Sequence, residues 1–248
     1  GEPVVFKTSA SLEQLTINAD FVKVEDVTVA GDVIVTAEAA TELALNNVTI
    51  EGELIVEEQA LETASVEPIA NKVTTLKVTI ENTEVGTIVV DRPRVQIVSE
   101  SGVKLVKLTT NVTFVDVTGK VETFIVESIK PLEITGKATI ETIEALKEAE
   151  LTLAIEGLVE TLNVSNASAK VTLQKKANVA NLIVPKGVGA SQIVQNYSEV
   201  AKQIVKVTET GGQEQPKPTP TPSPSPSPSP SPTPTPEPGK SITLSLMH

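Results

Sequence analysis

A repeat of about 19 residues is the feature of this chain that most restricts its fold. Short segments of the type x-x-Leu-x-Val recur through residues 1–211, mostly at steps of 18 to 21 residues. One repeat is too short to bury its own apolar face, whereas stacked repeats bury it together. The apolar residues at the third position of these segments are Leu15, Val33, Leu54, Ile88, Val106, Phe124, Ile143, Leu162, Leu182 and Val205.

A second series of segments, of the type Val-Thr-Ile, lies between the first ones and keeps the same period. Both series alternate apolar and polar residues, as half-buried strands do. We therefore predict an all-β, single-domain parallel β-solenoid of about ten rungs, each 17–21 residues long and about 4.8 Å from the next. The outward middle residues of the second series are Thr49, Thr79, Gln96, Thr113, Glu133, Thr152 and Thr172.

Three segments depart from the simple repeat. The step of 34 residues between Leu54 and Ile88 is interpreted as one insertion at an edge of the coil, with an irregular rung as the alternative. Residues 142–150 favour a helix by propensity, but they keep the register of both series, so we predict a strand and a turn. Residues 198–204 are either a last rung or a short helix that caps the coil.

The composition of the chain changes sharply after Gly211. Of the 17 prolines, 12 lie between Pro216 and Pro238, at every second position. Such a run has few backbone donors and no apolar side chains, and it favours extended polyproline II over a packed structure. We predict a β-helix module at residues 1–211, a disordered Pro/Thr/Ser-rich linker at 212–239 and the start of a truncated following domain at 240–248.

Composition also excludes several functional classes. A net charge of −12 with only two arginines opposes nucleic-acid binding, which needs clustered cations. The chain has no Cys and its one His is His248, so thiolate and histidine sites for metals or catalysis are excluded. No apolar run has the roughly 18 residues of a membrane span. No pair of carboxylates stands out as a glycosidase site, and we expect no enzyme activity, with a polysaccharide lyase or glycosidase as the remaining alternative.

Repeated outward hydroxyls are the candidate ligand-binding groups. On a flat parallel sheet they would form ladders that can hydrogen-bond a polymer with a repeating hydroxyl pattern. The alternative is that these threonines only reflect the β-propensity of Thr. The predicted ligand contacts are Thr113, Glu133, Thr152, Thr172, Thr123 and Thr161.

Stacked carboxylates are the candidate metal ligands. Glu122, Glu141 and Glu160 occupy the same place in three successive rungs, where like charges repel unless water, a nearby lysine or a cation screens them. Oxygen-rich sites without His or Cys suit Ca²⁺. The rival calcium sites are the cluster of Asp20, Asp26 and Asp32 and the acidic segment 57–67.

The rung pattern and the Pro/Thr/Ser linker together resemble the β-helix modules of clostridial cell-surface proteins. The nearest family is the family-54 carbohydrate-binding module of a surface laminarinase, and the resemblance covers the architecture of residues 1–239. It implies a right-handed β-helix, binding of β-glucan or xylan, and calcium dependence.

We therefore expect a non-catalytic, calcium-associated module that binds an extracellular polysaccharide of the β-glucan, xylan or chitin type. It would be a monomer, secreted or held at a bacterial cell surface, and covalently linked to the catalytic domain of a glycanase. We expect no nucleic-acid partner and no membrane insertion. The alternative is a structural or adhesive spacer of a bacterial surface protein, without a sugar ligand.

Overall fold

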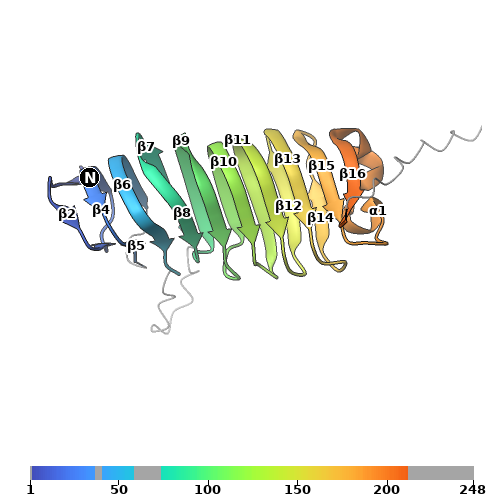
Figure 1. Ribbon diagram of the computed structural model, residues 1–248, viewed down its shortest axis with the longest axis horizontal. Coiled ribbons are helices and arrows are strands. Elements are labelled where there is room, and N and C mark those ends of the chain that lie inside the picture. Colours follow the sequence, from blue (N-terminus) through green and yellow to red (C-terminus); the bar gives the residue numbers. More distant parts are fainter. Residues whose placement is uncertain (1, 37–40, 59–73, 212–248) are drawn as a thin grey trace, which may run out of the picture. The chain divides into compact units, whose positions relative to one another are not determined.

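The chain folds into a coil of parallel β-strands whose successive rungs follow one another in chain order (Figure 1). This computed structural model describes residues 2–36, 41–58 and 74–211. The predicted linker, the following domain and most of the predicted insertion lie outside these residues. The strands are β1 (Val4–Lys7), β2 (Ser11–Leu12), β3 (Leu15–Ile17), β4 (Val22–Val29), β5 (Val33–Val35), β6 (Glu42–Val56), β7 (Leu76–Glu81), β8 (Glu84–Val90), β9 (Arg94–Leu108), β10 (Phe114–Val126), β11 (Pro131–Ala145), β12 (Glu150–Ile155), β13 (Gly157–Val164), β14 (Lys170–Leu173), β15 (Ala177–Val184) and β16 (Ile204–Glu209).

All strand pairs are parallel, and long strands bend around the coil. In β11, residues 131–136 pair with β12, whereas residues 139–145 pair with β13. We call the stretch equivalent to residues 131–135 face 1, the stretch equivalent to 137–140 face 2 and the stretch equivalent to 142–145 face 3. Inward side chains of all three faces meet in one aliphatic core. The predicted all-β parallel solenoid is confirmed.

The predicted core column is confirmed by strand register for all but its last member. Leu182 pairs with Val207, and Val205 is 72% exposed, so the prediction for Val205 was wrong by two residues. The sequence alternates through Val205 and Val207 as on one face of a strand, but Val205 and Lys206 are two consecutive exposed residues between the inward Ile204 and Val207, so alternation alone chose the wrong valine. The column runs through Leu15, Val33, Leu54, Ile88, Val106, Phe124, Ile143, Leu162, Leu182 and Val207.

The bend between faces 1 and 2 depends on residues that accept a positive φ. Gly136 has φ 105°, and a Cβ at this position would lie 2.1 Å from the carbonyl oxygen of Val117 in the preceding rung. In earlier rungs Asp26, Asn47 and Asn82, which register aligns with one another, lie in the left-handed region at a bend of the coil. Asn and Asp tolerate this conformation better than other residues with a side chain. The Asn47 amide donates a 2.6 Å hydrogen bond to Asp26, which joins two rungs at the bend.

The irregular segments follow the expectations in most respects. Leu43 of β6 pairs with Val78 of β7, so the chain between these strands adds no rung, as an insertion at an edge requires. Residues 142–145 belong to β11 and are followed by a turn, as predicted against their helix propensity. Residues 198–204 contain most of α2 (Tyr197–Val200) and the 3₁₀ helix η1 (Ala201–Gln203) before β16 begins.

The two ends of the coil differ. At the C-terminal end, α1 (Ala190–Ile193) and α2 bury Ile193, Tyr197 and Val200 against the last rungs. At the other end, β1 leaves Val4 59% and Val5 55% exposed. None of the helices in the described part of the chain has the length and apolar composition that a bilayer crossing needs.

Replacing Leu162 with Asp tests the core column. Leu162 is fully buried between Ile143 and Leu182, so the carboxylate would have no partner in an aliphatic environment. We expect a loss of more than about 4 kcal/mol in the free energy of unfolding, measured by thermal or denaturant melting. The control is Asn163→Asp, one position along and half-buried on the outside, which should melt close to the wild type. Equal melting of the two variants would contradict the column.

Two glycine substitutions test the bend. Gly136→Ala combines a positive φ with a clash against backbone, and we expect it to lower the free energy of unfolding by about 1–3 kcal/mol. Gly86→Ala is the control, because a Cβ there has no neighbour within 4 Å and its φ is ordinary. It should leave the stability unchanged or slightly raised. Denaturant melting of both variants is the measurement. If Gly136→Ala proved as stable as Gly86→Ala, then the bend would not require a glycine at position 136.

Candidate functional site

A stripe of paired acidic and hydroxyl side chains runs along the outside of the coil, where face 2 turns into face 3. In three adjacent rungs the sequence Glu-Thr occupies the same place, and register aligns Thr123 with Thr142 and Thr142 with Thr161. We call these six residues the Glu–Thr stripe: Glu122, Thr123, Glu141, Thr142, Glu160 and Thr161. In the next rung the aligned residue is Asn181, so the series of hydroxyls ends there with an amide, whose oxygen accepts a 2.8 Å hydrogen bond from Thr208. Residues predicted separately to bind sugar and to bind calcium thus lie on one surface.

A lysine neutralises part of this stripe. The Nζ atom of Lys120 lies 2.7 Å from a carboxylate oxygen of Glu141, and both side chains are substantially exposed. The hydrogen bond and the charge of Glu141 raise the pKa of Lys120 above its ordinary value, and Glu122 and Glu160 act in the same direction. Because the pKa of Lys120 is raised in the folded state, the pair with Glu141 stabilises the fold fully at pH values below the ordinary lysine pKa. This stabilisation is lost only as the pH rises through the raised pKa. Lys120 is therefore charged at neutral pH.

The Asp cluster predicted from the sequence is divided among different contacts. Asp20 accepts a hydrogen bond from the backbone of Thr41, and Asp32 accepts one from the backbone of Glu53. Asp26 contacts Lys7 and Asn47, and these two hydrogen bonds lower the pKa of its carboxyl group. Each aspartate thus joins its rung to a neighbouring one.

The described residues offer no assembled calcium site. Among them, no group of three or more acidic or histidine side chains is close enough to hold a metal ion. The segment 57–67 lies mostly outside the described residues, and calcium binding stays a prediction of the sequence. Within the Glu–Thr stripe, the contacts favour an ion pair with Lys120 over a cation bridge.

The second predicted ladder lies on face 1 and is shorter than expected. Register aligns Glu133 with Thr152 and Thr152 with Thr172, as predicted. The residue aligned with Glu133 in the preceding rung is Phe114, so the placement of Thr113 in this ladder was wrong. Thr113 precedes the strand, and its hydroxyl donates a 3.0 Å hydrogen bond to the carbonyl of Pro93.

In the two rungs before Glu133, the same column holds a half-buried cation–aromatic pair. The guanidinium of Arg94 lies over the ring of Phe114, 4.0 Å from its centroid, and Arg94 also hydrogen-bonds the hydroxyl of Thr75. In the neighbouring column of outward side chains, hydrogen bonds join Gln96, Asp116 and Thr135 of three successive rungs. The carboxylate of Asp116 accepts one bond from Gln96 and one from Thr135, at 2.9 and 2.8 Å. These polar groups already have partners in neighbouring rungs, which leaves fewer of them for a ligand.

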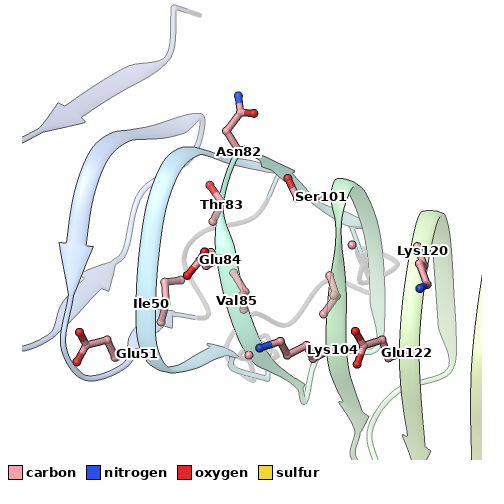
Figure 2. Close-up of a pocket in the computed structure, with 13 residues that line it drawn as sticks. Ile50, Glu51, Asn82, Thr83, Glu84, Val85, Ser101, Lys104, Lys120 and Glu122 are labelled. Atoms are coloured by element: carbon pink, nitrogen blue, oxygen red, sulfur yellow. The ribbon is translucent and has the colours of Figure 1, made fainter.

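A groove of about 700 Å³ opens on face 2 and adjoins the Glu–Thr stripe (Figure 2). Its volume falls within the range of roughly 300–1,000 Å³ found for small-ligand sites. Figure 2 shows Ile50 and Val85 between Asn82 and Ser101 at the top and Glu51, Lys104 and Glu122 at the bottom. Glu122 belongs both to the groove and to the Glu–Thr stripe. Lys120 lines the groove and pairs with Glu141 of the stripe. The lining residues are Ile50, Glu51, Asn82, Thr83, Glu84, Val85, Gly86, Ser101, Gly102, Val103, Lys104, Lys120 and Glu122.

The groove lies where the rungs change length. Register shifts between β6 and β8 at Ile50–Glu53, where β6 has one residue more, and between β9 and β10 at Gly119–Val121, where β9 has two residues more. The buried hydroxyl of Thr83 helps to join the mismatched rungs, since it accepts a hydrogen bond from the amide of Val48 and donates one to the carbonyl of Glu81. These irregularities interrupt the even wall of the coil.

The groove was not predicted from the sequence. The residue that could have indicated it is Gly86, whose equivalents in later rungs are Lys104, Glu122, Glu141 and Glu160. A glycine in a column of long side chains indicates a local hollow.

No family model, no curated protein and no solved structure matches the chain at a significant level. The two surfaces of the coil that could hold a ligand are the Glu–Thr stripe and the groove beside it.

Proposed function

We propose that residues 1–211 form a non-catalytic module that binds an extracellular polysaccharide of the β-glucan, xylan or chitin type. The Glu–Thr stripe is the contact surface of this proposal. The observation that carries it is the repetition of one acidic and one hydroxyl side chain, in register, over three adjacent rungs.

The chemistry of the stripe suits a polyol. Ionised carboxylates accept hydrogen bonds, and threonine hydroxyls both donate and accept them, so each rung offers a complementary set to sugar hydroxyls. The spacing of about 4.8 Å between rungs is close to the repeat of an extended glycan chain. Several weak contacts to one polymer add up to useful retention because each binding event raises the local concentration of the next unit.

The proposed binding mode is polar, in keeping with the composition. The chain has no Trp and its aromatic content is 2%, so a broad stacking platform for sugar rings is not part of the proposal. Affinity for short fragments along the stripe should therefore be low, and retention should grow with polymer length. Such a module would act by holding a linked glycanase domain near its substrate, outside the cell.

A structural or adhesive spacer without a sugar ligand is the second candidate. The specific observation in its favour is the hydrogen-bonded series of Gln96, Asp116 and Thr135, whose polar groups serve the coil itself. A spacer should remain in the supernatant with every insoluble polysaccharide. An enzyme would release reducing sugar or unsaturated product, and we expect neither.

Two matched double variants test the contact surface. Thr142→Val/Thr161→Val removes two adjacent hydroxyls of the stripe, and Thr152→Val/Thr172→Val removes two adjacent hydroxyls of face 1 at nearly constant volume. Two lost hydrogen bonds of about 1 kcal/mol each should weaken retention on the bound polymer by roughly tenfold or more in the first variant only. The measurement is a pull-down on β-glucan, xylan and chitin.

Weaker retention in the face 1 variant and unchanged retention in the stripe variant would place the binding site on face 1. Weakening by the face 1 variant alone would assign the polymer to Glu133, Thr152 and Thr172. Failure of the wild type to bind any of the three polymers would favour the spacer.

Calcium is tested in the same pull-down. If the ion predicted from the sequence takes part, then EDTA should reduce retention and lower the melting temperature, and added Ca²⁺ should restore both. The variant Glu122→Gln/Glu141→Gln/Glu160→Gln should then lose the response to EDTA. Retention and melting that are identical with EDTA and with Ca²⁺ would remove the ion from the proposal.

A further inference from the structure

The groove beside the stripe has a polar rim and is closed behind by the core of the coil. Ile50, Val85 and Val103 line its back, and each is at most 5% exposed, so they belong to the core and offer a ligand little apolar surface. Asn82 and Ser101 supply amide and hydroxyl groups at the rim (Figure 2). The accessible side chains of the groove are therefore amide, hydroxyl, carboxylate and ammonium groups, which donate and accept hydrogen bonds. A sugar ring carries hydroxyls around its edge that match such a lining.

We infer that this groove is a discrete subsite for one or two neutral glycosyl units, at the end or at a branch of the polymer bound by the stripe. This inference rests on the proposed function, because it assigns the groove to the same glycan. It also goes further, since it separates a specific anchoring point from the extended, weakly selective stripe.

The charges around the groove determine the class of sugar. Glu51, Glu84 and Glu122 line it, whereas Lys120 is paired with Glu141. Lys104 is the remaining cation of the lining. Three carboxylates around one small site repel the carboxylate of a uronic acid, and this repulsion separates neutral from acidic sugars. Within the described residues, the side chains of Glu51, Glu84 and Lys104 form no ion pair or hydrogen bond with the protein, so their charged groups remain for a ligand.

Gly86 keeps the groove open. Because its φ is ordinary and a Cβ there would have no neighbour within 4 Å, a side chain can be added without disturbing the backbone. Ala180 occupies the equivalent place several rungs away, next to Asn181, which pairs with Thr161. Ala180 is therefore a control position, because a phenylalanine there has the same place in its rung but lies outside the groove.

The experiment compares Gly86→Phe with Ala180→Phe. Neutral short oligosaccharides (laminari-, xylo- and chito-oligosaccharides) and oligogalacturonate are titrated against full-length protein by calorimetry and by amide NMR shifts. We expect the wild type and Ala180→Phe to bind one of the neutral series, with shifts at Thr83, Val85 and Ser101. Gly86→Phe should bind it at least tenfold more weakly, and oligogalacturonate should not bind.

A second variant keeps the test independent of the added bulk. Lys104→Met removes an exposed charged group of the rim without touching the core, and it should weaken the neutral oligosaccharide several-fold. Thermal melting establishes that each variant is folded. Unchanged binding by both Gly86→Phe and Lys104→Met, equal binding of oligogalacturonate, or no binding of any neutral oligosaccharide would each overturn the subsite.

The two proposals fail separately. If Thr142→Val/Thr161→Val loses the polymer but keeps the short oligosaccharide, then both the stripe and the groove are supported. Polymer retention that persists in Gly86→Phe, together with unchanged oligosaccharide binding, overturns the groove alone. Oligosaccharide binding at the groove without any polymer retention supports the groove and overturns the proposed function.

Discussion

Parallel pairing between rungs is the constraint on which the whole structure depends. A single rung cannot cover its inward Val, Ile and Leu side chains, so these are buried only when the next rung stacks in register. Because side chains alternate with a period of two, a slip of one residue would turn the apolar set outward. The core thus fixes the register, and the register in turn places outward residues in columns. The Glu–Thr stripe is a consequence of this order, formed without any dedicated loop.

The inward pattern could be predicted because the core leaves few alternatives. Leu162 and its neighbours were found by spacing alone, since each must lie above an apolar residue one rung away. The face 1 ladder was predicted less well. Val112-Thr113-Phe114 alternates like a strand, yet the pairing partners of Val95 and Ile97 are Val115 and Val117. Both alignments bury apolar side chains, and only the length of the turn between rungs decides between them.

The groove was beyond sequence reasoning for a different reason. It arises from residues gained or lost at bends, near Ile50–Glu53 and near Gly119–Val121, and such changes leave the apolar spacing almost unaltered. Likewise, the contact of Lys120 with Glu141 crosses from one column to another, so it follows from the three-dimensional stacking of bends and from the reach of a long side chain. The regular features of the coil follow from the period of the sequence, whereas the groove and the contact of Lys120 with Glu141 depend on departures from that period.

Because most contacts of a rung are with the rungs next to it, the length of the coil is not fixed by the packing of any one rung. Duplicating a Glu-Thr rung in tandem would insert one more layer of about 4.8 Å while every existing layer kept the same kind of neighbour. The capping helices at one end and the groove in the middle would be carried along unchanged. In evolution, the length of such a surface could therefore be altered by copying gene segments, one repeat at a time, without the redesign that a globular core would demand.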